Sequence, residues 1–476
     1  MTTITDSPAH LRPLSRLGVL VMLTAPFLAG LDFFITNVAL PTIERSLGAS
    51  AGSLALIVAG YGIAYAVFLV LGGRLGDEYG RRRLFVIGLA SFVLASLLAG
   101  LAPTLPILIA ARVAQGTASA LMTPQTLATF QSTLAGTARG RAIASYAAAG
   151  GLAAAVGQLL GGILVSAFGW RSIFLVNVPV GLCALLLVRF CVPASRSQAR
   201  VGVDAVGTVL LGCSLALLLI PLTEGPAAGW PWWTFASLGA FVGLAAVFVR
   251  WSLTAASRGV TPLLPLSLVL GAPSMRRGLP VLVVFFAVFG AFMFVFALVA
   301  QDGLGLSSLA AGLAITPVCV AYFITSFRVP RLVERFGKRV LIAGLVLEGV
   351  GFAGAVAVVV AWWSVLGGAL ARSWAPVALV VIALIIVGIG QALGVGALFR
   401  LVLSQVPVSS AGVGGGVLVT TQQGALALGV AALGSGFAAL AAGPGVVTGT
   451  LVVGGILVVV TLTLSIAARV LPSDEA

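Results

Sequence analysis

The sequence predicts an all-α integral membrane protein with fourteen transmembrane helices, and two observations lead to this fold class. Of 476 residues, 60% are hydrophobic and only 8% are charged, with a mean hydropathy of +1.19, far outside the range of soluble domains. The apolar runs are mostly about 18 to 25 residues long, which is what a helix needs to cross a hydrocarbon layer roughly 30 Å thick. Strands of a membrane barrel would instead give short alternating segments.

Turns and charges divide the apolar sequence into fourteen expected spans. The polar tail "MTTITDSPAHLRPLSR" precedes a run that is too long for a signal-peptide core and has no clear cleavage site, so we expect this run to remain as the first span. The spans are expected at residues 17–38, 54–71, 84–101, 105–130, 142–167, 173–191, 206–222, 233–253, 279–300, 309–329, 340–360, 377–399, 413–440 and 446–468.

Membrane topology explains the positive charge better than nucleic acid does. The formal net charge is +14, but almost every basic residue lies within a few positions of an apolar run. In a fourteen-span arrangement the loops of one side hold nearly all of these residues, and only Arg45, Arg171 and Arg372 fall on the other side. The positive-inside rule therefore predicts a multi-pass protein of the cytoplasmic (inner) membrane with both termini cytoplasmic. The lipid bilayer is its expected surrounding, and no nucleic-acid partner is expected.

One charged loop occurs twice. The stretch "GRLGDEYGRR" at 73–82 matches "PRLVERFGKR" at 330–339 in its arginine, leucine, acidic, aromatic, glycine and basic positions. The first copy joins spans two and three and the second joins spans ten and eleven, which predicts two six-span units with spans seven and eight between them. The expected domains are an N-terminal six-helix bundle at 1–195, two linker helices with flanking loops at 196–275, and a C-terminal six-helix bundle at 276–476.

Four motifs resemble those of a known family. The first loop copy is similar to "GxLaDrxGrRr", the loop signature of the major facilitator superfamily. The stretches "LDFFITNVALPTI" at 31–43, "LIAARVAQGTASA" at 108–120 and "WRSIFLVNVPVG" at 170–181 resemble motifs of its fourteen-span drug:proton antiporters. The resemblance covers essentially the whole chain in order. It implies the major facilitator fold, with two six-helix bundles plus two extra helices between them, and antiport of the multidrug efflux type that gives antibiotic resistance.

The repeated loop is predicted to act as a cytoplasmic latch. Asp77 can accept hydrogen bonds near a helix N-terminus and pair with arginine, while Gly73 and Gly80 permit close packing and a tight turn. Such a cluster can hold the two halves together in one state and release them in the other. The alternative is a topology anchor, which alone would need neither Asp77 nor the spaced glycines. The expected latch residues are Gly73, Asp77, Gly80, Arg81, Arg82, Glu334, Gly337 and Arg339.

One departure from the family pattern lies in span five. The antiporter motif "gxxxGPxxGG" is matched by "AAAVGQLLGG", which keeps Gly157, Gly161 and Gly162 but has Gln158 in place of proline. Without proline the helix keeps a backbone donor and any kink weakens. The small residues that let helices approach are still present. Antiport therefore stays open against symport or facilitated diffusion.

Three ionisable side chains lie clearly inside the expected spans: Asp32, Arg112 and Glu348. Each is costly in hydrocarbon, so each should face a cavity or a partner. Asp32 and Arg112 are expected at a similar depth at about 1.5 Å per residue. If spans one and four adjoin, as they do in the resembled fold, the two can interact directly or through Asn37, Gln115 or water.

These residues suggest how protons are coupled to transport. Desolvation favours the protonated form of a carboxyl group and a nearby arginine favours the ionised form, so opening to water or displacement of the arginine by substrate changes the proton occupancy. The hypothesis is that Asp32 carries the exchanged proton or meets a cationic substrate, and that Arg112 tunes it. A static buried pair that fixes helix packing is the alternative. Glu348 is a second protonatable site, a packing residue or a substrate contact.

Polar and aromatic side chains inside the spans are candidates for lining a substrate cavity. Phe285 and Phe289 belong to a helical series in span nine that can face a greasy aromatic substrate or the lipid. Unpaired amides and hydroxyls are disfavoured against lipid. The cavity candidates are Asn37, Tyr61, Tyr65, Gln115, Gln125, Gln158, Phe285, Phe289, Gln422 and Gln423.

The sequence disfavours other function classes. It has no "GxxxxGKS" phosphate loop, and its one histidine, His10, lies in the tail without a nucleophile or a metal-ligand cluster, so no enzyme, metal or cofactor is expected. A channel stays an alternative, although two repeats with paired loops suit alternating access better. We expect a monomeric secondary transporter that exports a small hydrophobic or cationic drug or natural product, driven by the proton gradient. A proton-coupled or uncoupled carrier of an endogenous metabolite is the alternative.

Overall fold

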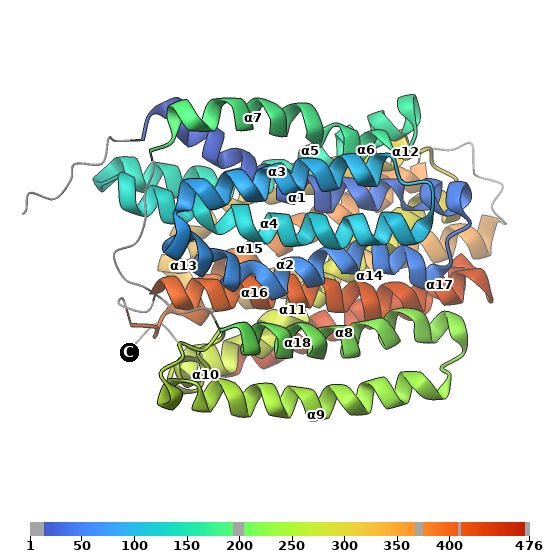
Figure 1. Cartoon of the computed structure of the whole chain (residues 1–476). Coiled ribbons are helices and arrows are strands. Elements are labelled where there is room, and N and C mark those ends of the chain that lie inside the picture. The colour runs from blue at the N-terminus through green and yellow to red at the C-terminus, as the bar shows by residue number, and fades with distance from the viewer. Residues whose placement is uncertain (1–13, 194–203, 367–374, 408–410, 472–476) are drawn as a thin grey trace, which may run out of the picture.

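The computed structural model describes residues 14–193, 204–366, 375–407 and 411–471, and their helices run roughly side by side (Figure 1). Within these residues fourteen helices are long and apolar enough to cross a membrane. They correspond in order to the fourteen expected spans, so the predicted all-α membrane class is confirmed. Arg372 and the first predicted domain boundary, at 195/196, lie outside the described residues.

The spans follow one another with short connections. The first six are α1 (Arg16–Leu47), α2 (Ala51–Tyr79), α3 (Arg81–Gly100), α4 (Leu105–Thr133), α5 (Gly136–Phe168) and the pair α6 (Ser172–Leu175) and α7 (Asn177–Cys191). The linker has α8 (Ala205–Ala228), α9 (Trp232–Thr254), η1 (Ala256–Arg258) and α10 (Leu266–Gly271). The last six spans comprise α11 (Pro273–Leu298) with η2 (Val299–Gly303), α12 (Ser308–Ser326), the short α13 (Val329–Phe336), α14 (Arg339–Leu366), α15 (Ala375–Leu403), α16 (Ala411–Gly429) with η4 (Val430–Gly434) and α17 (Ser435–Ala442), and α18 (Val446–Ala467) with η5 (Ala468–Val470).

The helices extend beyond the apolar runs from which they were predicted. The first helix was expected to end at residue 38, but α1 continues through Pro41 to Leu47. Pro41 has no N–H, but its carbonyl oxygen accepts a hydrogen bond from Arg45 Nε at 3.0 Å. Gly48 then ends the helix in the left-handed region. Asp32 therefore lies at the midpoint of a helix of 32 residues.

The helices of each predicted six-span unit pack on one another. In the first unit α4 packs on both α2 and α3, and α1 packs on α5. In the second, α14 packs on α15 and α18, and α11 packs on α16. We call α1–α7 the N-terminal bundle and α11–α18 the C-terminal bundle. The linker helix α8 packs on α2, and α9 lies beside α8 at the edge of the molecule (Figure 1). The second predicted boundary, at 275/276, falls in the first turn of α11, and the domain limits stay predictions.

The two bundles are in contact at the end far from the signature loops. We call the end that carries both loop copies the arginine-rich end. Away from it, a β-carbon at Gly162 of α5 would lie 2.7 Å from the Ser308 carbonyl oxygen of α12, so only glycine allows this approach. Gln301 Nε2 also donates to the Val38 carbonyl oxygen of α1 at 2.9 Å. The observed arrangement is therefore closed at the end opposite the arginine-rich end.

The ion pairs of both signature loops lie within their own bundles. Arg81 Nη2 lies 2.8 Å from Asp77 Oδ1, and Arg81 Nη1 donates to the Ala128 carbonyl oxygen of α4 at 2.8 Å. In the second copy, Glu334 of α13 lies 3.7 Å from Arg400 of α15. The expected pairing of Asp77 with arginine is confirmed. The latch between the halves stays a prediction, since these pairs stabilise each bundle separately in the observed arrangement.

Only some of the loop glycines act as expected. Gly80 (φ 101°) and Gly337 (φ 53°) confirm the tight turn in both copies, where a side chain would be strained. Close packing was expected at Gly73, but a β-carbon there would lie 3.7 Å from Pro124, an ordinary distance. The preceding residue, Gly72, lies against the α4 backbone instead, because one residue along a helix turns the side-chain position by about 100°. In the same loops Arg82 donates to the Val192 carbonyl oxygen at 3.2 Å, and Arg339 begins α14.

Asp204 connects the two linker helices and the loop that follows them. Its carboxylate accepts hydrogen bonds from Gly207 N of α8 at 2.7 Å, from Trp251 Nε1 of α9 at 2.9 Å and from Leu263 N at 2.7 Å. The residue is buried, and Arg74 of α2 donates to the backbone of the same loop. Three donors on one buried carboxylate make this contact strong.

Replacement of Asp204 with alanine should loosen the loop at 256–265. We expect trypsin to cut after Arg258 at least about tenfold faster in detergent-solubilised Asp204→Ala, because local opening no longer breaks three charge-assisted hydrogen bonds. The measurement is the appearance of the fragment that begins at Gly259. Glu334→Ala, which removes an exposed carboxylate, is the control and should leave the rate unchanged. Equal cleavage of Asp204→Ala and the unmodified protein would contradict this role.

Candidate functional site

A fully buried ion pair lies inside the N-terminal bundle. Arg112 Nη1 of α4 donates to Asp32 Oδ2 of α1, and both side chains are 0% exposed. The expected contact between the first and fourth spans is confirmed. In such an interior two opposite charges attract strongly, and either charge alone would be costly.

Amide side chains surround the other oxygen of the carboxylate. Gln115 Nε2 and Asn177 Nδ2 donate to Asp32 Oδ1 at 2.9 and 2.8 Å. Gln115 Nε2 also lies 2.9 Å from Ser96 Oγ. Since Ser96 belongs to α3, Gln115 to α4 and Asn177 to α7, side chains of four helices meet around the Asp32 carboxylate. This set, with Arg112, is called the Asp32 cluster below.

Arg112 has contacts that do not depend on Asp32. Its Nε donates to the Ile57 carbonyl oxygen at 3.0 Å, and Nη1 also donates to Gln115 Oε1 at 3.0 Å. Among the described residues Nη2 has no hydrogen-bond partner. The rings of Tyr61 and Phe174 lie with their centroids 4.5 and 5.7 Å from Arg112 Cζ. These cation–π contacts can stabilise the guanidinium when its carboxylate partner is neutral.

The sequence of α4 explains how the cluster is assembled. Arg112 and Gln115 are nearly one turn apart, so they lie on one face of the helix and both reach Asp32. Gly116 lies against the Tyr61 carbonyl oxygen of α2, where a β-carbon would clash. The motif "RVAQG" thus combines two polar side chains toward α1 with one glycine that lets α2 approach.

Several predicted cavity residues lie inside the N-terminal bundle. Tyr61 Oη donates to the Ala29 carbonyl oxygen at 2.9 Å, and Tyr65 packs edge-on to Tyr61 with ring centroids 6.0 Å apart. Gln125 Nε2 donates to the Gly72 carbonyl oxygen at 2.8 Å, which joins α4 to α2. Asn37 donates to its own helix, at the Phe33 carbonyl oxygen, and is not among the hydrogen-bond partners of Asp32.

Other cavity candidates lie where the bundles face each other. Gln158 Nε2 of α5 lies 3.7 Å from Met293 Sδ of α11, and the rings of Phe34 and Phe289 are 6.4 Å apart. Gln158, which stands in place of the proline of the family motif, therefore contacts the opposite bundle. The helix α5 is continuous from Gly136 to Phe168. Gln422 and Gln423 of α16 are half-buried.

Phe285 was expected to line the cavity, but it packs inside the C-terminal bundle. It is 1% exposed, and its ring fills the space beside Gly394 of α15, where a β-carbon would lie 2.7 Å from it. It also packs edge-on to Phe286. Phe285 and Phe289 are four residues apart, which turns the side-chain position by about 40°, and of the two only Phe289 has a ring contact with the N-terminal bundle in the described part of the chain.

Glu348 lies in the C-terminal bundle, far along the chain from the Asp32 cluster. It is 0% exposed on α14, where α15 approaches so closely that a β-carbon at Gly390 would lie 2.6 Å from Glu348 N. Among the described residues neither carboxylate oxygen has a hydrogen-bond partner, and the same holds for both amide atoms of nearby Gln391. Within the same ranges no group of three or more His, Cys, Asp or Glu could hold a metal ion.

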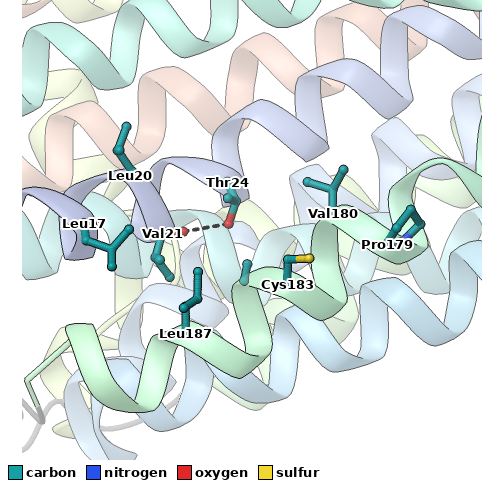
Figure 2. A pocket seen from close by; sticks show the side chains of 9 residues that line it. Leu17, Leu20, Val21, Thr24, Pro179, Val180, Cys183 and Leu187 are labelled. Atoms are coloured by element: carbon teal, nitrogen blue, oxygen red, sulfur yellow. Dashed lines mark hydrogen bonds between the residues drawn. The ribbon is translucent and has the colours of Figure 1, made fainter.

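A groove of about 430 Å³ lies between α1 and α7, but it has none of the candidate site residues (Figure 2). Its lining is apolar except for Thr24, whose hydroxyl donates to the Val21 carbonyl oxygen at 2.6 Å. Leu20 and Leu187 on its walls are 63% and 39% exposed, so the groove opens onto the outer surface of the bundle. In a membrane this surface faces lipid, and acyl chains can fill the groove.

Two members of the Asp32 cluster are absent from the residues that sequence reasoning proposed. Asn177 lies within the motif "WRSIFLVNVPVG", so the resemblance contained a signal for it, namely an amide inside a span. No sequence signal indicated Ser96, because the hydroxyl of a lone serine in a membrane helix usually donates a hydrogen bond to the backbone of its own helix. The structure identifies it only through its contact with Gln115.

Comparisons with known proteins agree with this fold. The Major Facilitator Superfamily matches residues 22–430 of the chain. A probable actinorhodin transporter of Streptomyces coelicolor is 35% identical over 91% of this chain and 74% of its own length. A cephamycin export protein of Amycolatopsis lactamdurans is 34% identical over 86% and 82%. Among solved structures, a D-xylose-proton symporter has a TM-score of 0.65 at 14% identity, over 96% of this chain and 98% of that one.

The match in sequence extends over most of the chain, and the match in fold includes both bundles. The family consists of membrane transporters, so this multi-pass protein carries small molecules and is not an enzyme. The chain belongs to the Major Facilitator Superfamily.

Proposed function

We propose that this protein exports a hydrophobic or cationic natural product or drug in exchange for protons, and that Asp32 carries the proton. The names of its relatives support export: one is a probable actinorhodin transporter, one a cephamycin export protein, and a third a tetracenomycin C resistance and export protein of Streptomyces glaucescens, 29% identical over 87% of this chain and 74% of its own length. The observation that carries the proposal is the buried contact of Asp32 with Arg112.

Proton binding and the ion pair exclude each other in this site. When Asp32 is ionised, the carboxylate accepts from Arg112, Gln115 and Asn177. When a proton binds, the carboxyl group loses its charge and the attraction of Arg112 falls. Arg112 then keeps its contacts with the Ile57 carbonyl oxygen and the Tyr61 ring. The site thus has one set of contacts for each protonation state of Asp32, which is what a reversible proton carrier needs.

The topology part of the proposal rests on charge. The arginine-rich end is cytoplasmic, with both termini on that side of the inner membrane, because positive loops are retained there. The observed arrangement is then closed toward the outside, where Gln301 contacts the Val38 backbone. The protein works as a monomer in the lipid bilayer, and the proton gradient is its only energy source. The signature loops join the bundles in the opposite state, in which their own end is closed.

Export is tested with a panel of toxic compounds. Cells that express the protein should tolerate at least one hydrophobic or cationic antibiotic at several-fold higher concentration than cells that express Asp32→Asn. Minimal inhibitory concentrations measure this, and immunoblots of the membrane fraction check that both proteins are present. Uniform susceptibility across the panel would argue against drug export and favour the metabolite carrier.

The ion pair is tested by removing one charge or both. Asp32→Asn leaves Arg112 as an unpaired buried charge, which costs about 3 to 5 kcal/mol of stability. Asp32→Asn combined with Arg112→Gln removes both charges, so we expect it to recover most of the thermal stability but no proton-driven transport. Unfolding temperature in detergent and substrate-driven pH change in proteoliposomes separate the two effects. Proton-driven transport in the double variant would exclude Asp32 as the carrier.

Glu348 provides the matched comparison, because it is also a fully buried acid. Glu348→Gln changes the carboxyl group to an amide of the same shape, just as Asp32→Asn does. We expect Glu348→Gln to keep at least about half of the proton-driven transport, since its carboxylate contacts no arginine in the described part of the chain. Loss of proton coupling with retained substrate exchange would instead make Glu348 a second protonatable site.

A further inference from the structure

Asp32 is fully buried, so a proton that it exchanges with water has to pass through the N-terminal bundle. One face of α4 offers a series of polar side chains for this passage. Their spacing of three or four residues places them on a single face of the helix. Each is at most 3% exposed. We call this series the hydroxyl face of α4; starting from the Asp32 cluster, it contains Gln115, Ser119, Thr123, Thr126 and Thr129.

The hydroxyl face leads in one direction only. Between Leu105 and Ala111, on the other side of Arg112, α4 has only apolar residues. Toward the arginine-rich end the series continues to Thr129, and Thr133 in the last turn of α4 is half-buried. Polar groups therefore connect the Asp32 cluster with the arginine-rich end, and on α4 they do not connect it with the opposite end.

Two hydroxyls on this face lack partners. Ser119 Oγ lies 2.9 Å from Tyr61 Oη, and Thr126 Oγ1 donates to the Met22 carbonyl oxygen at 2.9 Å. In the described part of the chain, Thr129 Oγ1 has no hydrogen-bond partner, and Thr123 Oγ1 lies near the Tyr65 phenol without a hydrogen bond of ordinary geometry. A buried hydroxyl without a partner is costly, and in proteins such groups are commonly satisfied by bound water.

The spacing of these oxygens suits bridging water. Residues three or four apart on a helix are separated by about 4.5 to 6 Å along its axis. One water molecule with two hydrogen bonds spans about 5.5 Å. A hydroxyl both donates and accepts, so each hydroxyl or water oxygen from Thr129 to Ser119 can take a proton from one neighbour while it releases another to the next. The amide of Gln115 cannot relay a proton in this way, so bridging water has to carry the proton from Ser119 to Asp32. At the end, bulk water has lost one proton and the Asp32 carboxylate has become a carboxylic acid, with nothing oxidised or reduced.

We propose that the hydroxyl face of α4 is a proton path between Asp32 and water at the arginine-rich end, separate from the route of the substrate between the bundles. The ionisable groups beside it are Asp32 and Arg112 at its inner end and the phenols of Tyr61 and Tyr65 along α2. The path rests on the proposed function, because it takes Asp32 as the proton carrier. The path gives the hydroxyls of Thr123 and Thr129 a role in proton transfer, whereas helix packing alone would not require a hydroxyl at either position.

Thr123→Val gives the sharpest test. Valine has nearly the shape of threonine, and the hydroxyl that it removes makes no protein hydrogen bond of ordinary geometry, its only polar neighbour on α2 being the Tyr65 phenol, so the unfolding temperature should change little. A structural role alone therefore predicts no loss. The proton path predicts that Asp32 takes up a proton at least about tenfold more slowly, because the chain of hydrogen bonds is interrupted. Thr123→Ser, which restores the hydroxyl, should restore the rate.

The rate is measured without a transported compound. A light pulse releases protons from a caged acid in a suspension of the purified protein, and time-resolved infrared spectroscopy follows the carboxyl C=O band that is missing in Asp32→Asn. Thr117→Val is the control, since Thr117 lies on the opposite, more exposed face of α4 and donates to the Val113 carbonyl oxygen. It should leave the rate unchanged.

The outcomes separate the path from the function on which it rests. A slower Asp32 band in Thr123→Val with an unchanged final amplitude supports the path. An unchanged rate in both Thr123→Val and Thr129→Val overturns the path, while the proposed role of Asp32 stands. If the wild-type protein gives no Asp32 band after the proton pulse, Asp32 does not titrate, and both the path and the proposed coupling fail.

Discussion

The contact between Asp32 and Arg112 is the interaction on which the rest of the N-terminal bundle depends. Each charge is fully buried, and the free energy of placing either one there alone is high. The pair therefore draws α1 and α4 together, and Gln115, Asn177 and Ser96 add hydrogen bonds from α3, α4 and α7. In the proposed function the same arrangement responds to a single proton, because protonation of Asp32 would remove the negative charge of the pair.

In the proposed coupling, proton binding at Asp32 inside one bundle has to change the contact between the two bundles. The helix α1 is suited to transmit this change, because Phe34, two residues after Asp32, faces Phe289 of the C-terminal bundle. Phe34 and the next residue, Ile35, also pack tightly on α5, where β-carbons at Gly157 and Gly161 would lie 3.2 and 2.9 Å from them. The helix α5 in turn packs on α12 of the C-terminal bundle. We therefore expect a small rotation of α1 to shift two contacts between the bundles, that of Phe34 with Phe289 and that of α5 with α12.

Much of this organisation is predictable from the sequence, because hydrophobic length, arginine distribution and an internal repeat are all local signals. They gave the fourteen spans, whereas the contact of Asp32 with Arg112 was expected because spans one and four adjoin in the resembled fold. These local signals failed where a contact depends on how a helix is rotated about its own axis. Phe285 faces Gly394 within its own bundle, and Gly72 rather than Gly73 approaches α4. They also missed Ser96, because partner choice among serines depends on which helices meet. The extension of α1 to Leu47 was missed because the polar residues at the end of this helix have a composition that is also typical of loops.

The central claim is that substrate binding and proton release meet at Asp32, and release of protons by the purified protein tests it most directly. The compound with the largest effect in the susceptibility panel is added to protein in a weakly buffered detergent solution, and a pH indicator dye records the change. The account predicts a release of protons that saturates with the compound and is absent in Asp32→Asn, although the compound still binds. Equal proton release from both proteins would contradict it.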